Sequence, residues 1–228
     1  MEPLSISGRT VFADGVRWAE ISLDTQAGSI RSVKELDKDE EVGDLIFPGF
    51  IDIHVHAREY PKPNQSNRQA TAQWEAACRK ETFRSAGEAA INGGVTLFGA
   101  MPNDSMPPDN ARAYARKREI LASSICPVIL FAAVTQRSEP WQDIPYKVYL
   151  DAAPSPVSFT SWGDLENVLA RYNECRVFFH AEDPEILRHF QGPGPRWKTR
   201  PPEAEIRAVE KILELTAKLG LHSHICHV

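Results

Sequence analysis

The sequence predicts an α/β fold of parallel strands joined by helices, which closes as a (β/α)₈ barrel or opens as a doubly wound sheet. Beyond about residue 47, apolar strand-like runs alternate with helical stretches. Alternation of this kind implies right-handed crossovers between parallel strands. No GxGxxG or GxxxxGKS loop follows any of these strands. That absence disfavours the nucleotide-binding open sheets and favours the barrel.

The composition indicates a globular protein with a sizeable core. The 228 residues are 42% hydrophobic, with 31 acidic against 26 basic residues and a net charge of -5, so nucleic acid is not an expected partner. The longest apolar run, at 128–134, is too short to cross a bilayer. We therefore expect no membrane partner and a cytoplasmic protein. Four widely separated cysteines are predicted to be reduced: Cys78, Cys126, Cys175 and Cys226.

Residues 1–47 are predicted to form a small N-terminal β-domain, and residues 48–228 the barrel. In the first region, short apolar patches alternate with Gly and Asp, which indicates small antiparallel strands. These patches lie at 11–12, 21–23, 30–33 and 45–47.

In the second region the pattern predicts six strands and five helices. The expected strands are 50–56, 95–101, 127–134, 144–150, 176–180 and 221–228. The expected helices are 71–92 closed by Gly93-Gly94, 110–123, 162–172, 184–190 and 202–219 closed by Gly220. The last helix is the clearest, because apolar residues recur at helical spacing: Ile206, Val209, Ile212, Leu213 and Leu219.

The most informative motif is the pair of histidines that ends the first of these strands. His54 and His56 project from one face, because successive strand side chains point to opposite faces. Neutral imidazoles suit zinc, copper, iron or nickel. A chance pair is the alternative, but the apolar run and the preceding Pro48-Gly49 turn favour a buried strand with a metal site at a barrel mouth.

Functional residues of barrels lie at the C-terminal ends of strands, and three further strands end in residues of this kind. Lys147 lies on the fourth, His180 ends the fifth and His227 ends the sixth. Alternation separates His222 and His224 from His227. Because His227 is nearest the strand end, it is the expected ligand.

Lys147, Arg58 and Asn103 each allow two interpretations. Lys147 extends to a surface carboxylate such as Asp151, or desolvation favours its neutral amine, which adds carbon dioxide to form a bridging carbamate. Arg58 is an ordinary surface charge or the bidentate anchor of a substrate carboxylate. Asn103 is a turn residue or a substrate-binding amide.

The segment Gly49-Phe50-Ile51-Asp52-Ile53-His54-Val55-His56-Ala57-Arg58-Glu59 resembles the first-strand signature of the amidohydrolase superfamily, and within it of the dihydroorotases. Five further segments resemble later parts of that pattern in order and spacing. They are 92–96 with 101–103, 146–149, 180–183, 200–205 and 224–228. The resemblance covers roughly residues 45–228.

The resemblance implies a (β/α)₈ barrel, here with about its first six strands, preceded by part of a small β-sandwich. It also implies a binuclear zinc site. His54 and His56 would hold one zinc, carboxylated Lys147 would bridge both ions, and His180 and His227 would hold the second. A hydroxide shared by the two zincs would attack the carbonyl and interconvert dihydroorotate and N-carbamoyl-L-aspartate in pyrimidine synthesis.

In this family an arginine and an asparagine grip the substrate's carboxylate, and Arg58 and Asn103 match that pair. No catalytic acid or base is identified in the 228 residues, because the family's proton-carrying aspartate belongs to the eighth strand. We therefore expect this chain alone to be weakly active or inactive. A homodimer, or association with another enzyme of pyrimidine synthesis, is the expected assembly.

Two alternatives stay open. One is a hydantoinase or dihydropyrimidinase type of cyclic ureide hydrolase, which shares the metal frame but lacks the arginine. The other is a non-catalytic homologue that serves as a scaffold for another pyrimidine-pathway enzyme. The zinc content separates a working site from a scaffold, and the effect of Arg58 on carboxylate substrates separates the two enzymes.

Overall fold

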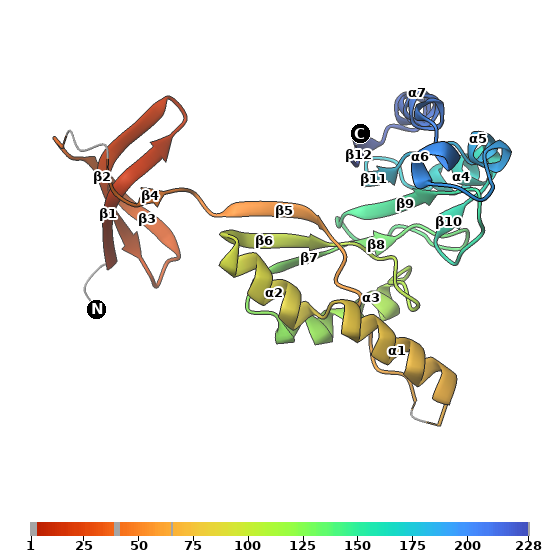
Figure 1. Cartoon of the computed structure of the whole chain (residues 1–228), viewed down its shortest axis with the longest axis horizontal. Helices are drawn as coiled ribbons and strands as arrows, with labels where there is room; N and C mark the ends of the chain where they lie inside the picture. The colour runs from red at the N-terminus through yellow and green to blue at the C-terminus, as the bar shows by residue number, and fades with distance from the viewer. Residues whose placement is uncertain (1–3, 39–41, 65, 228) are drawn as a thin grey trace. The chain divides into compact units, whose positions relative to one another are not determined.

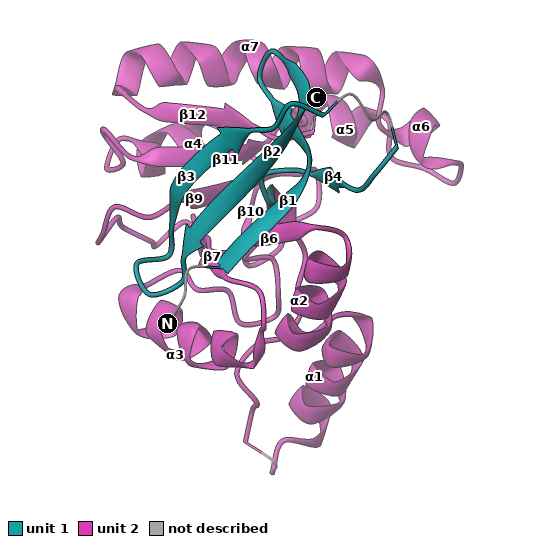
Figure 2. Ribbon diagram, turned by 90° about the vertical axis from the view of Figure 1, so that its left-hand side faces the viewer, with its two compact units in different colours: residues 1–50 teal, residues 51–228 magenta. Residues whose placement is uncertain are grey.

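The structure is a computed structural model that describes residues 4–38, 42–64 and 66–227. It divides into two compact units, Met1–Phe50 and Ile51–Val228 (Figure 2). Figure 1 shows the order of the elements along the chain. Within the described ranges, no helix has the length and apolar character needed to cross a membrane.

The first unit is a four-stranded sheet in the order β3-β2-β1-β4. Its strands are β1 (Leu4–Phe12), β2 (Gly15–Asp24), β3 (Ser29–Glu35) and β4 (Leu45–Ile46). The first three pair antiparallel, as expected. The short β4 pairs parallel with β1, so the prediction of antiparallel strands throughout is wrong for this one. Although β4 follows β3 in sequence, it lies at the opposite edge of the sheet, beside β1 and parallel to it.

The second unit contains the strands predicted for the barrel and one short strand, at 158–159, that the sequence pattern did not predict. They are β5 (Phe50–Val55), β6 (Val95–Ala100), β7 (Val128–Leu130), β8 (Ala132–Ala133), β9 (Tyr146–Leu150), β10 (Ser158–Phe159), β11 (Arg176–His180) and β12 (His222–Ile225). One sheet has the order β5-β6-β7, and another has β10-β9-β11-β12 with β8 beside β9. The pairs β6-β7, β8-β9, β9-β10, β9-β11 and β11-β12 are parallel. The predicted α/β fold with parallel strands, part of a barrel, is confirmed.

The third predicted strand, 127–134, is divided between the two sheets. Val128 pairs with Phe98 in β6, whereas Ala132 pairs with Tyr146 in β9. Between them Phe131 donates its backbone N–H to Ala100. The chain therefore changes neighbours within one short run, and this run connects the two sheets.

Gly99 allows the strands of the first sheet to approach each other closely. A Cβ atom at this position would lie 2.6 Å from the Ile53 carbonyl oxygen and 2.8 Å from the ring of Phe131. Neither contact fits a real side chain, and the first involves backbone. Only glycine fits between β5 and β7 here.

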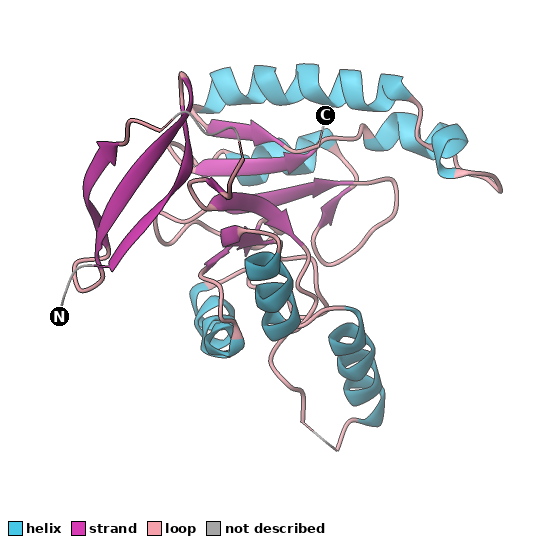
Figure 3. Ribbon diagram, turned by 60° about the vertical axis from the view of Figure 1, so that its left-hand side comes forward, coloured by secondary structure: helices cyan, strands magenta, loops and turns pink. Residues whose placement is uncertain are grey.

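The described residues form seven α-helices beside these strands, and Figure 3 distinguishes the helices and strands by colour. They are α1 (Arg68–Lys80), α2 (Phe83–Asn92), α3 (Ala111–Ile120), α4 (Trp162–Leu169), α5 (Pro184–His189), α6 (Arg196–Thr199) and α7 (Pro202–Leu219), with a short 3₁₀ turn, η1 (Leu121–Ser123), after α3. The prediction of one helix over 71–92 is wrong, because Glu81 and Thr82 are extended. Thr82 and Ser85 form a reciprocal capping box that begins α2.

The helix α7 agrees with its predicted bounds, and Gly220 ends it at φ 64°. Its buried face differs from the expected one. Ala204, Ala208, Ile212 and Leu215 are buried, whereas Ile206 and Leu213 are exposed. Small alanines on the buried face permit close packing of the helix.

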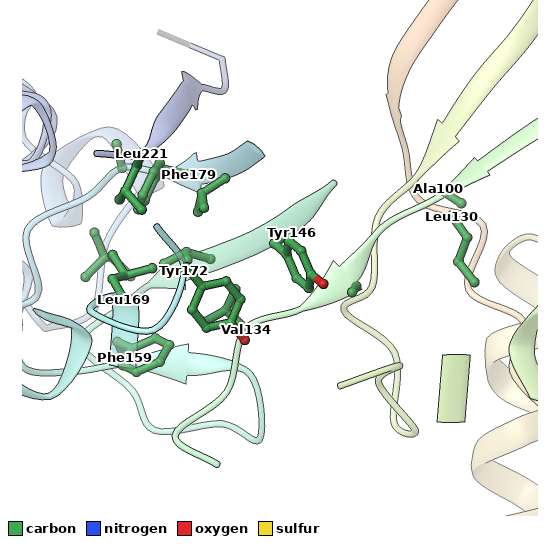
Figure 4. Packing of buried hydrophobic residues seen from close by; sticks show 14 of the residues in the cluster. Ala100, Leu130, Val134, Tyr146, Phe159, Leu169, Tyr172, Phe179 and Leu221 are labelled. Carbon is green, nitrogen blue, oxygen red and sulfur yellow. The ribbon is translucent and has the colours of Figure 1, made fainter. Parts of the chain in front are cut away.

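A large part of the core of the second unit lies on one face of β9 and β11. Tyr146, Val148 and Leu150 alternate along β9 and are buried, and Figure 4 shows Tyr146 with other residues of this cluster. Because strand side chains alternate, Lys147 and Tyr149 project from the opposite face. Packing of the apolar face therefore fixes where these two polar side chains stand.

Candidate active site

A cavity of about 490 Å³ lies at the ends of the parallel strands. All predicted site residues except Lys147 line it: His54, His56, Arg58, Asn103, His180 and His227. Other lining residues include Tyr149, Asp151, Arg196 and Arg200. The fold thus brings together side chains from the beginning, middle and end of the second unit.

The imidazoles form a row from one strand end to the next. The ring centroids of His54 and His56 are 5.2 Å apart, and those of His54 and His227 are 5.1 Å apart. The His227 ring is in turn 4.9 Å from the ring of His180. The ends of β5, β11 and β12 are therefore neighbours in this cavity.

His56 is oriented by Asn103. Its Nδ1 lies 2.8 Å from the amide oxygen of Asn103, which can only accept a hydrogen bond. Nδ1 therefore carries the proton, and Nε2 keeps its lone pair. An outer partner of this kind fixes the tautomer of a metal-binding histidine. The Arg58 guanidinium donates to the Asn103 backbone oxygen at 3.5 Å, so both predicted substrate residues are adjacent.

Burial keeps three of these imidazoles neutral. It lowers the pKa of His54 to about 4, with the charge of Lys147 adding to the effect. Burial also lowers the pKa of His56, opposed by the Asn103 hydrogen bond, and that of His227. Neutral imidazole is the form that binds a metal ion.

His227 reaches the cavity through an unusual backbone conformation. The strand β12 ends at Ile225, and His227 has φ 40°. A positive φ in a residue with a side chain is uncommon and costs about 1 kcal/mol. His222 and His224 lie outside the cavity, and the His224 ring packs against Phe178 with centroids 4.7 Å apart.

His180 belongs to a charged network. Its Nδ1 is 3.2 Å from Nε2 of His227, and its Nε2 is 2.7 Å from the carboxylate of Glu182. Arg200 pairs with Glu182 and also with Asp151, at 3.4 Å from the latter. Burial alone would raise the pKa of Glu182, but the hydrogen bond from His180 and the nearby Arg200 outweigh it and lower that pKa.

Lys147 is fully buried, and its ammonium nitrogen lies 3.0 Å from the sulfur of Cys226. The interpretation that it extends to Asp151 is wrong, because Asp151 pairs with Arg200 instead. Among the residues described, no carboxylate lies within ion-pairing distance of Lys147. Burial lowers the pKa of Lys147, partly offset by Cys226. The amine is thus disposed toward its neutral, nucleophilic form.

Sequence reasoning missed several cavity residues. Tyr149 is two residues beyond Lys147, so strand alternation would have placed both on one face. Its hydroxyl is buried and has no hydrogen-bond partner in the described parts of the chain. Burial raises its pKa. Arg200 lies in a matched segment without an assigned role, and Arg196 lies on α6, a helix that the pattern did not predict.

A metal ion requires several donor side chains directed at one point. In the described ranges, no group of three or more His, Cys, Asp or Glu side chains is arranged to hold a metal ion. Both ring nitrogens of His180 contact protein partners: Nδ1 contacts Nε2 of His227, and Nε2 contacts the carboxylate of Glu182. The chemistry of the set fits a transition metal nevertheless, because neutral imidazole is a ligand that such ions prefer. The predicted two-zinc ligand set stays a prediction.

A parallel sheet with polar side chains at the carboxyl ends of its strands defines the class of α/β barrel proteins whose sites lie at that edge. Residues 45–184 match the model of the amidohydrolase family. The chain belongs to this family, and the predicted resemblance is confirmed.

Curated relatives named dihydroorotase match nearly the whole chain. The protein of Thermococcus kodakarensis is 31% identical over 241 residues, which covers 100% of this chain and 51% of the relative. That of Pyrococcus horikoshii is 26% identical and covers 99% and 49%. The chain therefore spans about half the length of these relatives. A solved L-hydantoinase (dihydropyrimidinase) from Arthrobacter aurescens has a TM-score of 0.74 at 19% identity, covering 96% of this chain and 51% of that one, which shows the shared fold.

Proposed function

We propose that this chain carries a dihydroorotase-type site, which interconverts dihydroorotate and N-carbamoyl-L-aspartate in pyrimidine synthesis in the cytoplasm. The observation that carries the proposal is the position of Arg58. Its guanidinium lines the same cavity as His54, His56, His180 and His227. A carboxylate-bearing ring held by Arg58 would present its amide to these imidazoles. The relatives named dihydroorotase support the same substrate.

His54, His56, His180, His227 and carboxylated Lys147 would hold two zinc ions. Zinc, when bound, acidifies water and polarises a carbonyl group. Before zinc binds, Lys147 would react with carbon dioxide. Its neutral amine forms an N–C bond with carbon dioxide and releases a proton, which leaves an anionic carbamate. Complete burial of the amine, with Cys226 as its close polar contact, favours this reaction.

Three other side chains bind and orient the substrate. Arg58 forms a bidentate pair with the ring carboxylate. Asn103 holds the His56 tautomer through its side chain and Arg58 through its backbone oxygen. The buried hydroxyl of Tyr149 donates a hydrogen bond to a ring carbonyl oxygen, which satisfies a polar group that the described protein leaves without a partner.

Hydantoin or dihydropyrimidine hydrolysis is the nearest alternative enzyme. The fold resemblance to hydantoinases fits both activities and does not separate them. Arg58 separates them, because hydantoin and dihydrouracil carry no carboxylate for a guanidinium to bind. A scaffold role is the other alternative, and it requires no metal.

The test compares dihydroorotate with dihydrouracil, which is the same ring without the carboxylate. The 228-residue chain is loaded with zinc, dialysed, analysed for metal and titrated with each ring by calorimetry. We expect about two zincs per chain and at least tenfold tighter binding of dihydroorotate. The variant Arg58→Met should remove this preference, whereas Arg79→Met, an exposed arginine of α1 paired with Glu75, should retain it.

Equal binding of both rings, or an unchanged preference in the Arg58→Met variant, would refute the dihydroorotase assignment. Dihydrouracil binding alone would support the alternative enzyme. A chain that binds no zinc yet forms a stable complex with another protein would support the scaffold.

A further inference from the structure

Lys117 is a buried cation that takes no part in the proposed function and does not line the cavity. It lies on α3, where Arg112, Arg116 and Arg118 are exposed, yet its own side chain is only 1% exposed. Burial of an ammonium group is costly unless a partner compensates for it. The partner is the carboxylate of Asp104, which is 3% exposed. Such a pair fixes the two segments that carry it, because separation would leave each charge buried alone.

Asp104 connects this buried pair to the cavity, because it directly follows Asn103. One oxygen of its carboxylate pairs with Lys117. The other accepts the backbone N–H two residues further on, at 2.9 Å. The turn that carries Asn103 is therefore held from the side of α3. Asn103 in turn contacts His56 through its amide oxygen and Arg58 through its backbone oxygen, so a shift of this turn would disturb both contacts.

The segment that carries Arg58 is anchored to the surroundings of the same lysine. Glu59, the next residue, accepts the backbone N–H of Phe83 at 3.0 Å. The ring of Phe83 is fully buried, and the ammonium of Lys117 lies 5.9 Å from its centre. Burial lowers the pKa of Lys117, and the carboxylates of Asp104 and Glu59 oppose this shift. Lys117 thus interacts with the acidic residue that follows each member of the pair Arg58 and Asn103.

Recognition of a carboxylate depends on how exactly this pair is held. A guanidinium binds a carboxylate through two parallel hydrogen bonds, which require a defined direction of approach. Displacement of a binding group by about 1 Å is enough to lose much of its contribution. Arg58 and Asn103 are partly exposed, so buried neighbours must supply the rigidity that the two side chains lack.

We infer that Lys117 is a positioning residue for recognition of the ring carboxylate. Through Asp104 and the ring of Phe83, it fixes the segments that carry Asn103 and Arg58. This inference rests on the proposed function, in which Arg58 binds that carboxylate. Loss of Lys117 should therefore lower the preference for dihydroorotate over dihydrouracil, although no group that touches the ring is removed.

Two variants separate positioning from folding. Lys117→Met leaves Asp104 buried without its cation, which destabilises the fold strongly. The double variant Asp104→Asn, Lys117→Met removes both charges together and keeps a side-chain oxygen for the backbone N–H that Asp104 binds, so it should fold. The matched control is Arg116→Met, which removes an exposed cation of the same helix.

The test measures binding of the two rings to each variant of the 228-residue chain. Each protein is shown to be folded by circular dichroism and is titrated by calorimetry at saturating zinc. The unmodified chain and Arg116→Met should prefer dihydroorotate by at least about tenfold. The double variant should retain a preference of less than about threefold, with the affinity for dihydrouracil changed by less than about twofold. A folded Lys117→Met variant should behave in the same way.

The ratio of the two affinities is informative because a purely structural role would not change it. A folded double variant that keeps the full preference, or that binds both rings equally more weakly, would overturn the inference and leave the proposed function intact. Failure of both variants to fold would assign the pair to the stability of the fold and would also overturn the inference. Absence of any preference in the unmodified chain would overturn the proposed function itself.

Discussion

The two sides of the candidate site are constructed differently. On the β5 side, His54 and His56 are placed by the alternation of one strand, and a single amide, that of Asn103, orients the second ring. On the β11 side, His180 is hydrogen-bonded to Glu182, and Glu182 is paired in turn with Arg200. A local pattern fixes the first side, whereas a network of charges from separate elements fixes the second. The two sides should therefore respond differently to mutation.

The largest expected effect is on metal binding by the β5 side. The double variant His54→Ala, His56→Ala removes two proposed ligands and should lower zinc affinity by more than the roughly 10- to 100-fold that loss of an outer partner causes. Zinc content after dialysis and competition with a chelator measure this effect. His222→Ala removes an exposed histidine outside the cavity and should retain full zinc. A double variant that retains zinc would exclude these residues as ligands.

On the β11 side the largest expected effect is on stability. Arg200→Met leaves the partly buried Glu182 without its cation and should lower the free energy of unfolding by about 2 kcal/mol. Urea denaturation measures this change. The control is Arg176→Met, which breaks an exposed pair with Asp143 and should cost at most about 1 kcal/mol. Equal costs for the two variants would show that the network contributes no more than a surface pair.

Asn103→Ala tests whether one amide suffices to orient the β5 side. The variant loses the His56 partner but keeps the backbone oxygen that accepts from Arg58. Zinc affinity should fall about tenfold, with little change in unfolding free energy. Asn92→Ala, in which an exposed side-chain hydrogen bond on α2 is lost, is the control. An unchanged affinity would mean that the strand alone orients His56.

The smallest expected effect is the pH dependence of stability that arises from Tyr172, a core residue on neither side of the site. It provides a reference for the other stability measurements. Burial raises the pKa of Tyr172 to about 12 from the ordinary value of 10.0, partly opposed by its hydrogen bond with Ser138. The folded state thus holds this proton more tightly than the unfolded state does. The stability it supplies is complete below pH 10 and is lost as pH rises toward 12. Between pH 9 and 11 the loss is about 1 kcal/mol.

Urea denaturation at several pH values measures this slope. In the Tyr172→Phe variant the alkaline loss of stability should be smaller than in the unmodified protein, although the variant starts lower because it lacks the Ser138 hydrogen bond. Identical slopes would show that Tyr172 titrates alike in both states.

The contrast between the two sides also explains what the sequence could predict. Period-two alternation is a local rule, and it was sufficient to place His54 and His56 together. His227 was predicted from its nearness to a strand end, and the structure brings it there through a positive φ that no alternation rule contains. The family resemblance supplied the remaining positions, because it joins motifs that are distant in sequence.

Interactions between distant residues were not predictable in the same way. The contact of Lys147 with Cys226 joins residues 79 positions apart, and Asp151, its partner in one of the two interpretations, pairs with Arg200. The break between α1 and α2 at Thr82 has a capping signature, but the continuous helical pattern on both sides obscured it. Which partner a charged residue selects depends on the tertiary arrangement, and short-range patterns do not contain it.

Gly99 restricts the substitutions that this protein can tolerate during evolution. With a carbonyl 2.6 Å and an aromatic ring 2.8 Å from the place of any Cβ atom, even alanine is excluded. If every position were randomised and variants were selected for folding, this position should retain glycine.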